Sequence, residues 1–359
     1  FASLECFIDK TNTTKSAGPD GLLGTEDDGL PTTYDEFFAL CELISEKCSP
    51  ITWAGKHRQE YLNWFKTALA ANYEGLDQMS LNYSFDGTAT NLISVDANGN
   101  ITELEDLLIK GTDNGYELAK QAGKYYAVKF LQQVIKDGYA ASGASDVMYT
   151  QVQAQEDFVL SDGTLTTDSA MLVDGCWWEM EADRTFNDVE QSEGVDIRDD
   201  FGWLPLPQAN EAEAAKLASG EKKMTFSDYL NAVACIRAGL PEGVKKAALA
   251  FLQYAYTDKA LTDFTYTTGT TIGVDYLDQI DRSKLNYYTA SLINYLDKAD
   301  IIHQVSATAR FQKNRSSFVP TRIYGSGNYV DILEGTWKGN LSTLNYFKGH
   351  IGAYKGIAW

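Results

Sequence analysis

The sequence predicts an α/β protein that is long enough for two lobes. Its 359 residues exceed the size that one small hydrophobic core usually serves. The hydrophobic content of 44% and the aromatic content of 12% are typical of a packed globular protein. Short apolar runs bounded by turn residues, which predict strands, alternate with longer amphipathic stretches, which predict helices.

The predicted strands are short and are bounded by glycine, proline or aspartate. They cover residues 49–55, 170–173, 201–206 and 224–233. Pro205 and Pro207 close the third of these strands, because proline cannot donate a hydrogen bond to a neighbouring strand.

The predicted helices carry apolar residues at helical spacing. They cover the segment that opens at Pro31, the stripe from Tyr61 to Leu69, and residues 119–136, 149–159, 238–256, 285–299 and 329–347. Thr32 or Thr33 is the expected N-cap of the first helix. Residues 211–223 are expected to form a surface helix or a mobile loop.

The charge of the chain limits the classes of partner. The net charge is -20 and the pI is about 4.5. Nucleic acid is disfavoured because phosphates are bound by Lys and Arg, and a polybasic membrane contact is disfavoured for the same reason. No apolar run approaches the ~18 residues that would predict a membrane-spanning helix.

The cysteines predict neither zinc nor disulfide chemistry. None of the five cysteines forms a CxxC pair, and the chain has only three histidines. Cys41 and Cys48 would lie about 10 Å apart along one helix, which is too far for a disulfide unless the helix ends between them. Buried free thiols are the preferred interpretation.

Catalytic motifs do not identify an enzyme. The sequence has no GxSxG, P-loop, HExxH or dinucleotide-binding glycine motif. Nucleophilic catalysis is disfavoured by the three histidines and the missing motifs. A glycosidase pair of carboxylates stays open as an alternative, since an acidic chain always offers many carboxylates.

The stretch from Asp168 to Pro207 is the first candidate for a binding site. Asp174 and Gly175 form a turn after a predicted strand, and Trp177 and Trp178 follow at once. Adjacent residues of a strand point to opposite sides, so one tryptophan is expected in the core and the other beside a ligand.

Trp53 is a second candidate, because it stands at a predicted strand end, where ligands bind in open α/β sheets. His57 follows closely, and a lone histidine is more often a surface or capping residue than a catalyst.

Several phrases of the sequence, taken in order, resemble one family. They are Pro31 to Phe37, Ala170-Met171, Gly175 to Trp177, Gly202 to Pro207 and Ala247 to Tyr256. In this order the phrases resemble the family 1 extracellular solute-binding proteins of ABC sugar importers, the family that includes maltose-binding protein.

The resemblance implies a type II fold, like that of periplasmic binding proteins, with lobe 2 complete and lobe 1 only partly represented. Residues 1–30 would be an acidic, glycine-rich entry segment, and residues 31–226 would form the main part of lobe 2. Residues 227–302 would cross the hinge and supply a lobe 1 segment, and residues 303–359 would return to lobe 2. The N-terminal part of lobe 1 would be missing from this chain.

The resemblance also implies ligand-binding residues. Trp53 and Trp177 are the leading candidates to stack on sugar rings, and Trp178 is a further candidate for ligand binding. Asp228, at the crossing between the lobes, would accept hydrogen bonds from sugar hydroxyl groups. The equal alternative is that it is an aspartate of a turn or hinge with no role in binding. Tyr324, in the return across the hinge, is a further stacking candidate.

The expected function is therefore to bind a carbohydrate, in particular an oligosaccharide, for an ABC transporter, with permease subunits as partners and without catalysis. The protein would be an extracellular cell-surface lipoprotein of a Gram-positive-type bacterium, or periplasmic, and held to a membrane only by a lipid anchor outside this chain. A carbohydrate-active enzyme, either a glycoside hydrolase or a lyase, is the alternative, and a peptide-binding relative is a weaker one.

No cofactor is expected to be required, but the N-terminal loop is a candidate calcium site. Asp20, Asp27 and Asp28 stand among glycines, and Ca²⁺ prefers carboxylate and backbone oxygens. The EF-hand spacing is absent, so a solvated acidic turn is the alternative.

Overall fold

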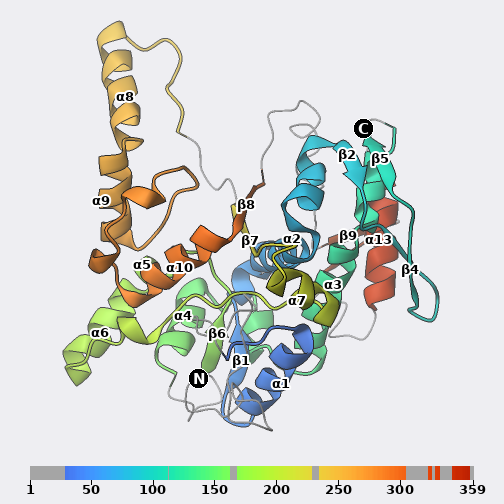
Figure 1. Ribbon diagram of the computed structural model, residues 1–359. Coiled ribbons are helices and arrows are strands. Elements are labelled where there is room, and N and C mark those ends of the chain that lie inside the picture. The colour runs from blue at the N-terminus through green and yellow to red at the C-terminus, as the bar shows by residue number, and fades with distance from the viewer. Residues whose placement is uncertain are drawn as a thin grey trace. The chain divides into compact units, whose positions relative to one another are not determined.

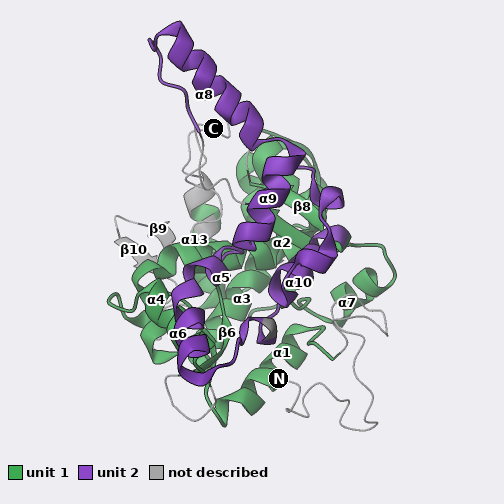
Figure 2. Ribbon diagram, turned by 90° about the vertical axis from the view of Figure 1, so that its left-hand side faces the viewer, with its two compact units in different colours: residues 1–173, 204–227, 298–359 green, residues 174–203, 228–297 purple. Residues whose placement is uncertain are grey.

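The structure is a computed structural model that describes residues 29–111, 113–161, 168–228, 234–304, 322–325, 328–331 and 342–355. The chain divides into two units, coloured separately in Figure 2. Unit 1 comprises residues 1–173, 204–227 and 298–359, and unit 2 comprises residues 174–203 and 228–297. The predicted lobe of residues 31–226 differs from this division, because residues 174–203 pack with residues 228–297.

Most of the strands that the structure describes belong to unit 1. Figure 1 labels the helices and strands along the chain. The helices and strands of unit 1 are α1 (Tyr34–Ser45), β1 (Ser49–Thr52), α2 (Arg58–Ser84), β2 (Asp86–Ala89), β3 (Ile93–Val95), β4 (Ile101–Glu103), β5 (Leu107–Lys110), α3 (Ala122–Lys136), α4 (Gln151–Val159), β6 (Ser169–Leu172), α7 (Glu211–Ala218), β7 (Thr225–Asp228), β8 (Asp300–His303), β9 (Arg322–Gly325), β10 (Asn328–Asp331) and α13 (Thr343–Lys355). Short 3₁₀ turns at Gly55–His57, Gly115–Lys120 and Ser142–Ser145 connect them.

The strands pair in twos. β1 and β6 are parallel, with Ile51 opposite Met171, and β7 pairs with β8. β2 with β5, β3 with β4, and β9 with β10 are antiparallel pairs.

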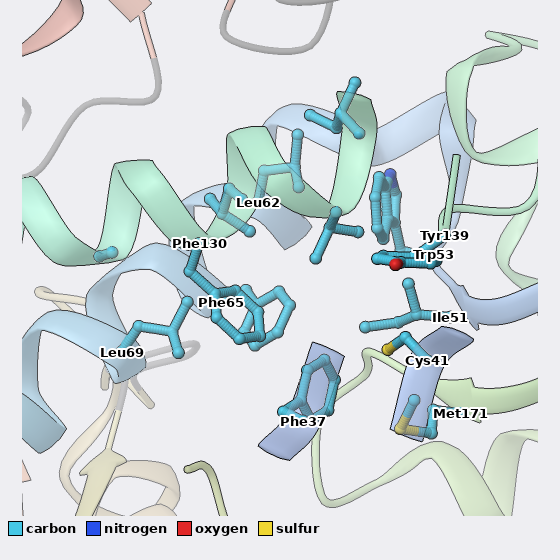
Figure 3. Close-up of a cluster of buried hydrophobic side chains, with 14 of the residues drawn as sticks. Phe37, Cys41, Ile51, Trp53, Leu62, Phe65, Leu69, Phe130, Tyr139 and Met171 are labelled. Atoms are coloured by element: carbon cyan, nitrogen blue, oxygen red, sulfur yellow. The ribbon is translucent and has the colours of Figure 1, made fainter. Parts of the chain in front are cut away.

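The core of unit 1 is aromatic and is centred on Phe130 of α3 (Figure 3). The Phe130 ring lies 4.6 Å from the ring of Tyr34, 5.1 Å from Phe37 and 5.7 Å from Phe65, measured between centroids. Such tilted contacts add about 0.5–1.5 kcal/mol each beyond the buried area. The core therefore joins α1, α2 and α3 on the β1–β6 pair.

Helix α1 begins as the sequence predicts. Thr33 is its N-cap, and the Thr33 hydroxyl accepts a hydrogen bond from the Glu36 N–H at 3.3 Å. The Glu36 carboxylate in turn accepts from the backbone N–H of Thr32 at 2.6 Å and of Thr33 at 3.4 Å. This reciprocal capping satisfies donors that a helix start leaves free.

A buried polar network joins α2 to the start of α3. The Glu74 carboxylate accepts a hydrogen bond from the Gly123 N–H at 2.7 Å. The Lys124 ammonium donates to Asn82 at 2.6 Å and to the Leu118 carbonyl at 2.9 Å. Burial raises the pKa of Glu74 to about 7 and lowers the pKa of Lys124 to about 7. The α2 helix is interrupted beside this network at Gly75, whose φ of 72° is a left-handed conformation.

Unit 2 is built mainly from helices. They are α5 (Trp178–Glu181), α6 (Asp183–Glu193), α8 (Glu242–Ala255), α9 (Asp258–Thr268) and α10 (Tyr287–Lys298), with 3₁₀ turns at Arg198–Asp200, Leu277–Gln279 and Arg282–Lys284. A small apolar cluster of Leu261, Tyr276, Ile280 and Ile293 holds α9 and α10 together.

Two predicted elements are wrong. Residues 201–206 form no strand, because the chain there pairs only at Gln208, which bridges to Thr33, and Pro205 and Pro207 have no N–H to donate. The predicted helix over 329–347 is wrong at its start, where residues 328–331 form β10; α13 covers Thr343–Lys355, and residues 332–341 lie outside the described residues. The predicted strand over 224–233 is β7 up to Asp228, and its remainder lies outside the described residues.

The cysteines agree with the prediction in part. Cys41, Cys48, Cys176 and Cys235 are free thiols, but only Cys41 of these is buried, whereas Cys48 and Cys176 are half-buried and Cys235 is exposed. Burial raises the pKa of Cys41 to about 12. Cys6 lies outside the described residues. Within the part of the chain that the structure describes, no helix is both long and apolar enough to cross a membrane.

Candidate functional site

The candidate site lies within unit 2 and begins with the turn at Asp174 to Trp177. The Asp174 carboxylate accepts the Gly175 N–H at 2.7 Å, and the Trp178 N–H donates to the Gly175 carbonyl at 3.1 Å. These bonds fold the chain tightly, as expected for an Asp-Gly turn. Helix α5 starts directly after Trp177.

The Trp177 ring lies over Gly175. A Cβ atom placed on Gly175 would come within 2.3–2.4 Å of the Trp177 ring atoms, so only glycine permits this position of the ring. The Trp177 side chain is half-buried. Trp177 is thus an aromatic side chain that is fixed in position and still partly exposed to solvent.

Trp178 belongs to the core of unit 2. It is only 6% exposed, and its ring contacts those of Phe186, Phe201 and Tyr288 at centroid distances of 5.9, 5.7 and 5.4 Å. The sequence predicted that one tryptophan is buried and the other is not, and the structure agrees. The reason given for it, the alternation of side chains along a strand, was wrong. Both residues stand at a helix start rather than on a strand, and the Trp178 ring is packed among other aromatic side chains.

Asp228 and the loop before Gly273 lie near the turn, because the Asp228 carboxylate and the Thr271 backbone both interact with the Cys176 thiol. The Asp228 carboxylate rests against Gly273, where a Cβ would come within 2.4 Å of Oδ2. The pKa of the Cys176 thiol is raised to about 11, mainly by burial; a hydrogen bond from the Thr271 backbone opposes this rise, and the nearby carboxylates of Asp228 and Asp174 add to it. These interactions bring two carboxylates, a protonated thiol and a backbone amide together.

A second group of polar side chains fixes the surrounding helices. The Glu179 carboxylate of α5 accepts a hydrogen bond from Asn286, whose side chain also accepts the Thr289 N–H at 2.9 Å at the start of α10. The Tyr288 hydroxyl donates to the Cys176 carbonyl at 3.4 Å. These bonds tie the turn and α5 to α10. The roles of Glu179 and Asn286 were not predicted from the sequence. The only signal was that the Glu179 carboxylate directly follows the tryptophan pair.

Trp53 occupies a different environment from the one predicted. It follows the end of β1, as expected, but it is 0% exposed and its indole N–H donates to the Ala144 carbonyl at 3.0 Å. The ring is packed in the core of unit 1, near Ile51 and Tyr139 (Figure 3). Trp53 is therefore a core residue, because its one polar group finds a partner inside the protein.

The other predicted residues are placed only in part. His57 is the N-cap of α2, and its side chain makes no capping bond there. Tyr324 pairs with Tyr329 through the backbone of the β9–β10 hairpin. Asp20, Asp27 and Asp28 lie outside the described residues. Elsewhere in the described chain, no three His, Cys, Asp or Glu residues are grouped to hold a metal ion.

Comparison with known proteins identifies the fold of this chain, through solved structures alone. No protein-family model and no curated protein sequence matches the chain. Among solved structures, 177 chains match. A chitin oligosaccharide binding protein matches with a TM-score of 0.53 at 14% identity, over 90% of this chain and 64% of that chain.

Two further solved structures come from Bifidobacterium animalis subsp. lactis. BlMnBP1, a binding protein of an ABC transporter in complex with mannobiose, matches with a TM-score of 0.50. BlMnBP2, a manno-oligosaccharide specific solute binding protein in complex with mannotriose, matches with a TM-score of 0.51. Each match has 14% identity and covers 90% of this chain and 63% of the solved chain.

The comparisons identify a fold, which is that of the three solved binding proteins. This chain shares that fold and spans less than two thirds of the length of the three solved chains.

Proposed function

We propose that this chain is the substrate-binding protein of an ABC transporter and that it binds an oligosaccharide. One observation carries the proposal: the half-buried Trp177 ring is fixed over Gly175, and the neighbouring Cys176 thiol lies near the Asp174 and Asp228 carboxylates. The shared fold with three oligosaccharide-binding proteins supports it.

The chemistry of the site suits an uncharged, hydroxyl-rich ligand. The face of an indole ring packs on the apolar face of a sugar ring, and a ring that is already held loses little freedom on binding. Ionised carboxylates accept hydrogen bonds from hydroxyl groups. A sugar needs no basic residue, which agrees with the net charge of -20.

The proposal extends to the family, the transport partner and the location of the protein. The protein belongs to family 1 of the extracellular solute-binding proteins, delivers its ligand to permease subunits, and performs no catalysis. It works outside the cell, on the surface of a Gram-positive-type bacterium through a lipid anchor outside this chain, or in a periplasm. Calcium bound by Asp20, Asp27 and Asp28, and ligand stacking by Tyr324, are added proposals that rest on residue type alone.

The test is calorimetric titration with mannobiose, mannotriose and chitin oligosaccharides. At least one sugar is expected to bind the chain, and Trp177→Ala is expected to weaken that affinity about 10-fold or more, the equivalent of 1.4 kcal/mol. Trp64→Ala is the matched control, because Trp64 is also half-buried but lies in unit 1 beside Tyr61. The bound sugar should be recovered intact, whereas new reducing ends would identify an enzyme.

A further inference from the structure

The loop Gly269–Gly273 of unit 2 lies against two carboxylates of the candidate site. It follows α9, and at its first residue a Cβ atom on Gly269 would come within 2.8 Å of Glu179 Oε2. At its last residue, a Cβ atom on Gly273 would come within 2.4 Å of Asp228 Oδ2. A shift of this loop therefore moves the atoms that confine both carboxylates.

Buried hydroxyl groups hold the backbone of this loop. The Ile272 N–H donates to the Tyr276 hydroxyl at 3.1 Å. The Tyr276 hydroxyl lies 2.7 Å from the Thr265 hydroxyl, and Thr265 in turn donates to the Thr270 carbonyl at 3.1 Å. Tyr276 and Thr265 are both 0% exposed, so these hydrogen bonds are shielded from solvent. We call this chain of hydrogen bonds the Tyr276 relay.

The hydrogens available fix the direction of each bond in the Tyr276 relay. A hydroxyl group has one hydrogen to donate, and Thr265 gives its hydrogen to the Thr270 carbonyl. The Tyr276 hydroxyl must therefore donate to Thr265 and accept from the Ile272 N–H. Loss of the Tyr276 hydroxyl leaves the Ile272 N–H without this acceptor, and a shielded donor without an acceptor is costly enough to make the loop rearrange.

The Tyr276 ring is held independently of its hydroxyl. It packs in the small apolar cluster of unit 2 with Leu261, Ile280 and Ile293. Phenylalanine has the same ring, so Tyr276→Phe keeps this packing and removes only the hydrogen bonds of the hydroxyl. The effect of the hydroxyl on the loop can therefore be measured in a chain whose apolar cluster is intact.

We propose that Tyr276 is a positioning residue of the candidate sugar site, because its hydroxyl holds the loop Gly269–Gly273 and thereby the Asp228 carboxylate. Tyr276 is fully buried, so it acts through the loop and not by touching the ligand. The role of Asp228 in sugar binding rests on the proposed function, whereas the effect of Tyr276 on the position of Asp228 does not.

The positioning is tested first without any sugar, by nuclear magnetic resonance. Tyr276→Phe should speed hydrogen exchange of the Ile272 N–H about 10-fold or more and should shift the carbon-13 signal of the Asp228 carboxyl, which Asp228→Asn identifies by its loss. Tyr266→Phe is the matched control, because the Tyr266 hydroxyl accepts the Asp281 N–H at 2.7 Å and lies outside the relay. It should leave both signals unchanged. An Asp228 signal that Tyr276→Phe does not move would overturn the proposal.

Titration with mannotriose and with a chitin oligosaccharide measures the consequence for binding. Tyr276→Phe should weaken the affinity about 10-fold, and Tyr266→Phe should leave it unchanged. Thr265→Val breaks the same relay and should match Tyr276→Phe, whereas Thr267→Val removes a hydroxyl that donates to the Asp263 carbonyl and should have no effect. The double variant Tyr276→Phe, Thr265→Val should bind no more weakly than either single variant, because the relay acts as one unit.

The outcomes separate this inference from the proposed function. If no sugar binds the natural chain, the proposed function fails, and the measurement without sugar still decides whether Tyr276 positions Asp228. If a sugar binds the natural chain but Tyr276→Phe leaves the affinity unchanged, or if Tyr276→Phe and Tyr266→Phe weaken it equally, the positioning role is wrong and the proposed function stands.

Discussion

The Asp228 carboxylate lies directly against Gly273, and it can take this position because Gly273 has no side chain. A Cβ atom at Gly273 would come within 2.4 Å of Oδ2, a separation that real structures do not show. The loop that contains Thr271 therefore fixes where the Asp228 carboxylate points.

Gly273→Ala is expected to displace the Asp228 carboxylate and to weaken sugar affinity about 10-fold, with a smaller effect on stability. Calorimetric titration measures the affinity. Gly243→Ala, in α8, is the matched control, because a Cβ atom there meets no neighbour within 4 Å. An unchanged affinity in Gly273→Ala would remove Asp228 from the site.

Trp53→Phe is expected to destabilise unit 1 without changing sugar affinity. The substitution removes the donor to the Ala144 carbonyl and leaves a buried acceptor unpaired, which costs about 1–3 kcal/mol. Chemical denaturation measures the loss. A weaker sugar affinity in a variant that stays folded would restore Trp53 as a ligand-binding residue.

Thr33→Ala is expected to cost about 1 kcal/mol of stability, because it removes the hydroxyl that caps α1. Thr33→Ser keeps the hydroxyl and should retain most of the stability. The comparison is made by denaturant titration of both variants, and equal losses in the two would show that the methyl group, not the cap, matters.

The Glu74 carboxyl is expected to make stability depend on pH between 4.5 and 7. Its pKa is raised from 4.5 to about 7 by burial, so the folded state binds the proton more tightly than the unfolded state does. The resulting stabilisation is complete below pH 4.5 and is lost as the pH rises to about 7.

Glu74→Gln copies the protonated side chain and should remove this loss. Relative to the natural chain, its free energy of unfolding should rise by roughly 3 kcal/mol between pH 4.5 and 7.5. Lys124 gives the opposite dependence, because its pKa is lowered to about 7, so its contribution is complete above pH 10.5 and is lost as the pH falls to about 7. A constant difference between Glu74→Gln and the natural chain would show that Glu74 ionises normally.

The helices were the part of the fold that could be predicted, because a stripe such as that of α3 repeats over fifteen residues. The residues from Phe201 to Leu206 could not be predicted, since an apolar run does not reveal whether a partner strand lies beside it. The hairpin of β9 and β10 was missed because its strands are four residues each, too short for a clear period.

The site was predictable in its residue types but not in its arrangement. The Asp-Gly turn and the tryptophan pair were visible in sequence, yet the ring of Trp177 over Gly175 and the Asp228 contact with Gly273 are tertiary contacts. Trp53 shows the limit most clearly. Its position at a strand end could be predicted. The Ala144 carbonyl that accepts its indole N–H could not, because it lies 91 residues further along the sequence.

The most direct measurement of the central claim is titration of the chain with mannotriose and with a chitin oligosaccharide, each repeated with Trp177→Ala. On the proposed function we expect saturable binding of at least one sugar, recovery of that sugar intact, and an affinity about 10-fold weaker or more in the variant. Binding that Trp177→Ala leaves unchanged, or cleavage of the sugar, would contradict it.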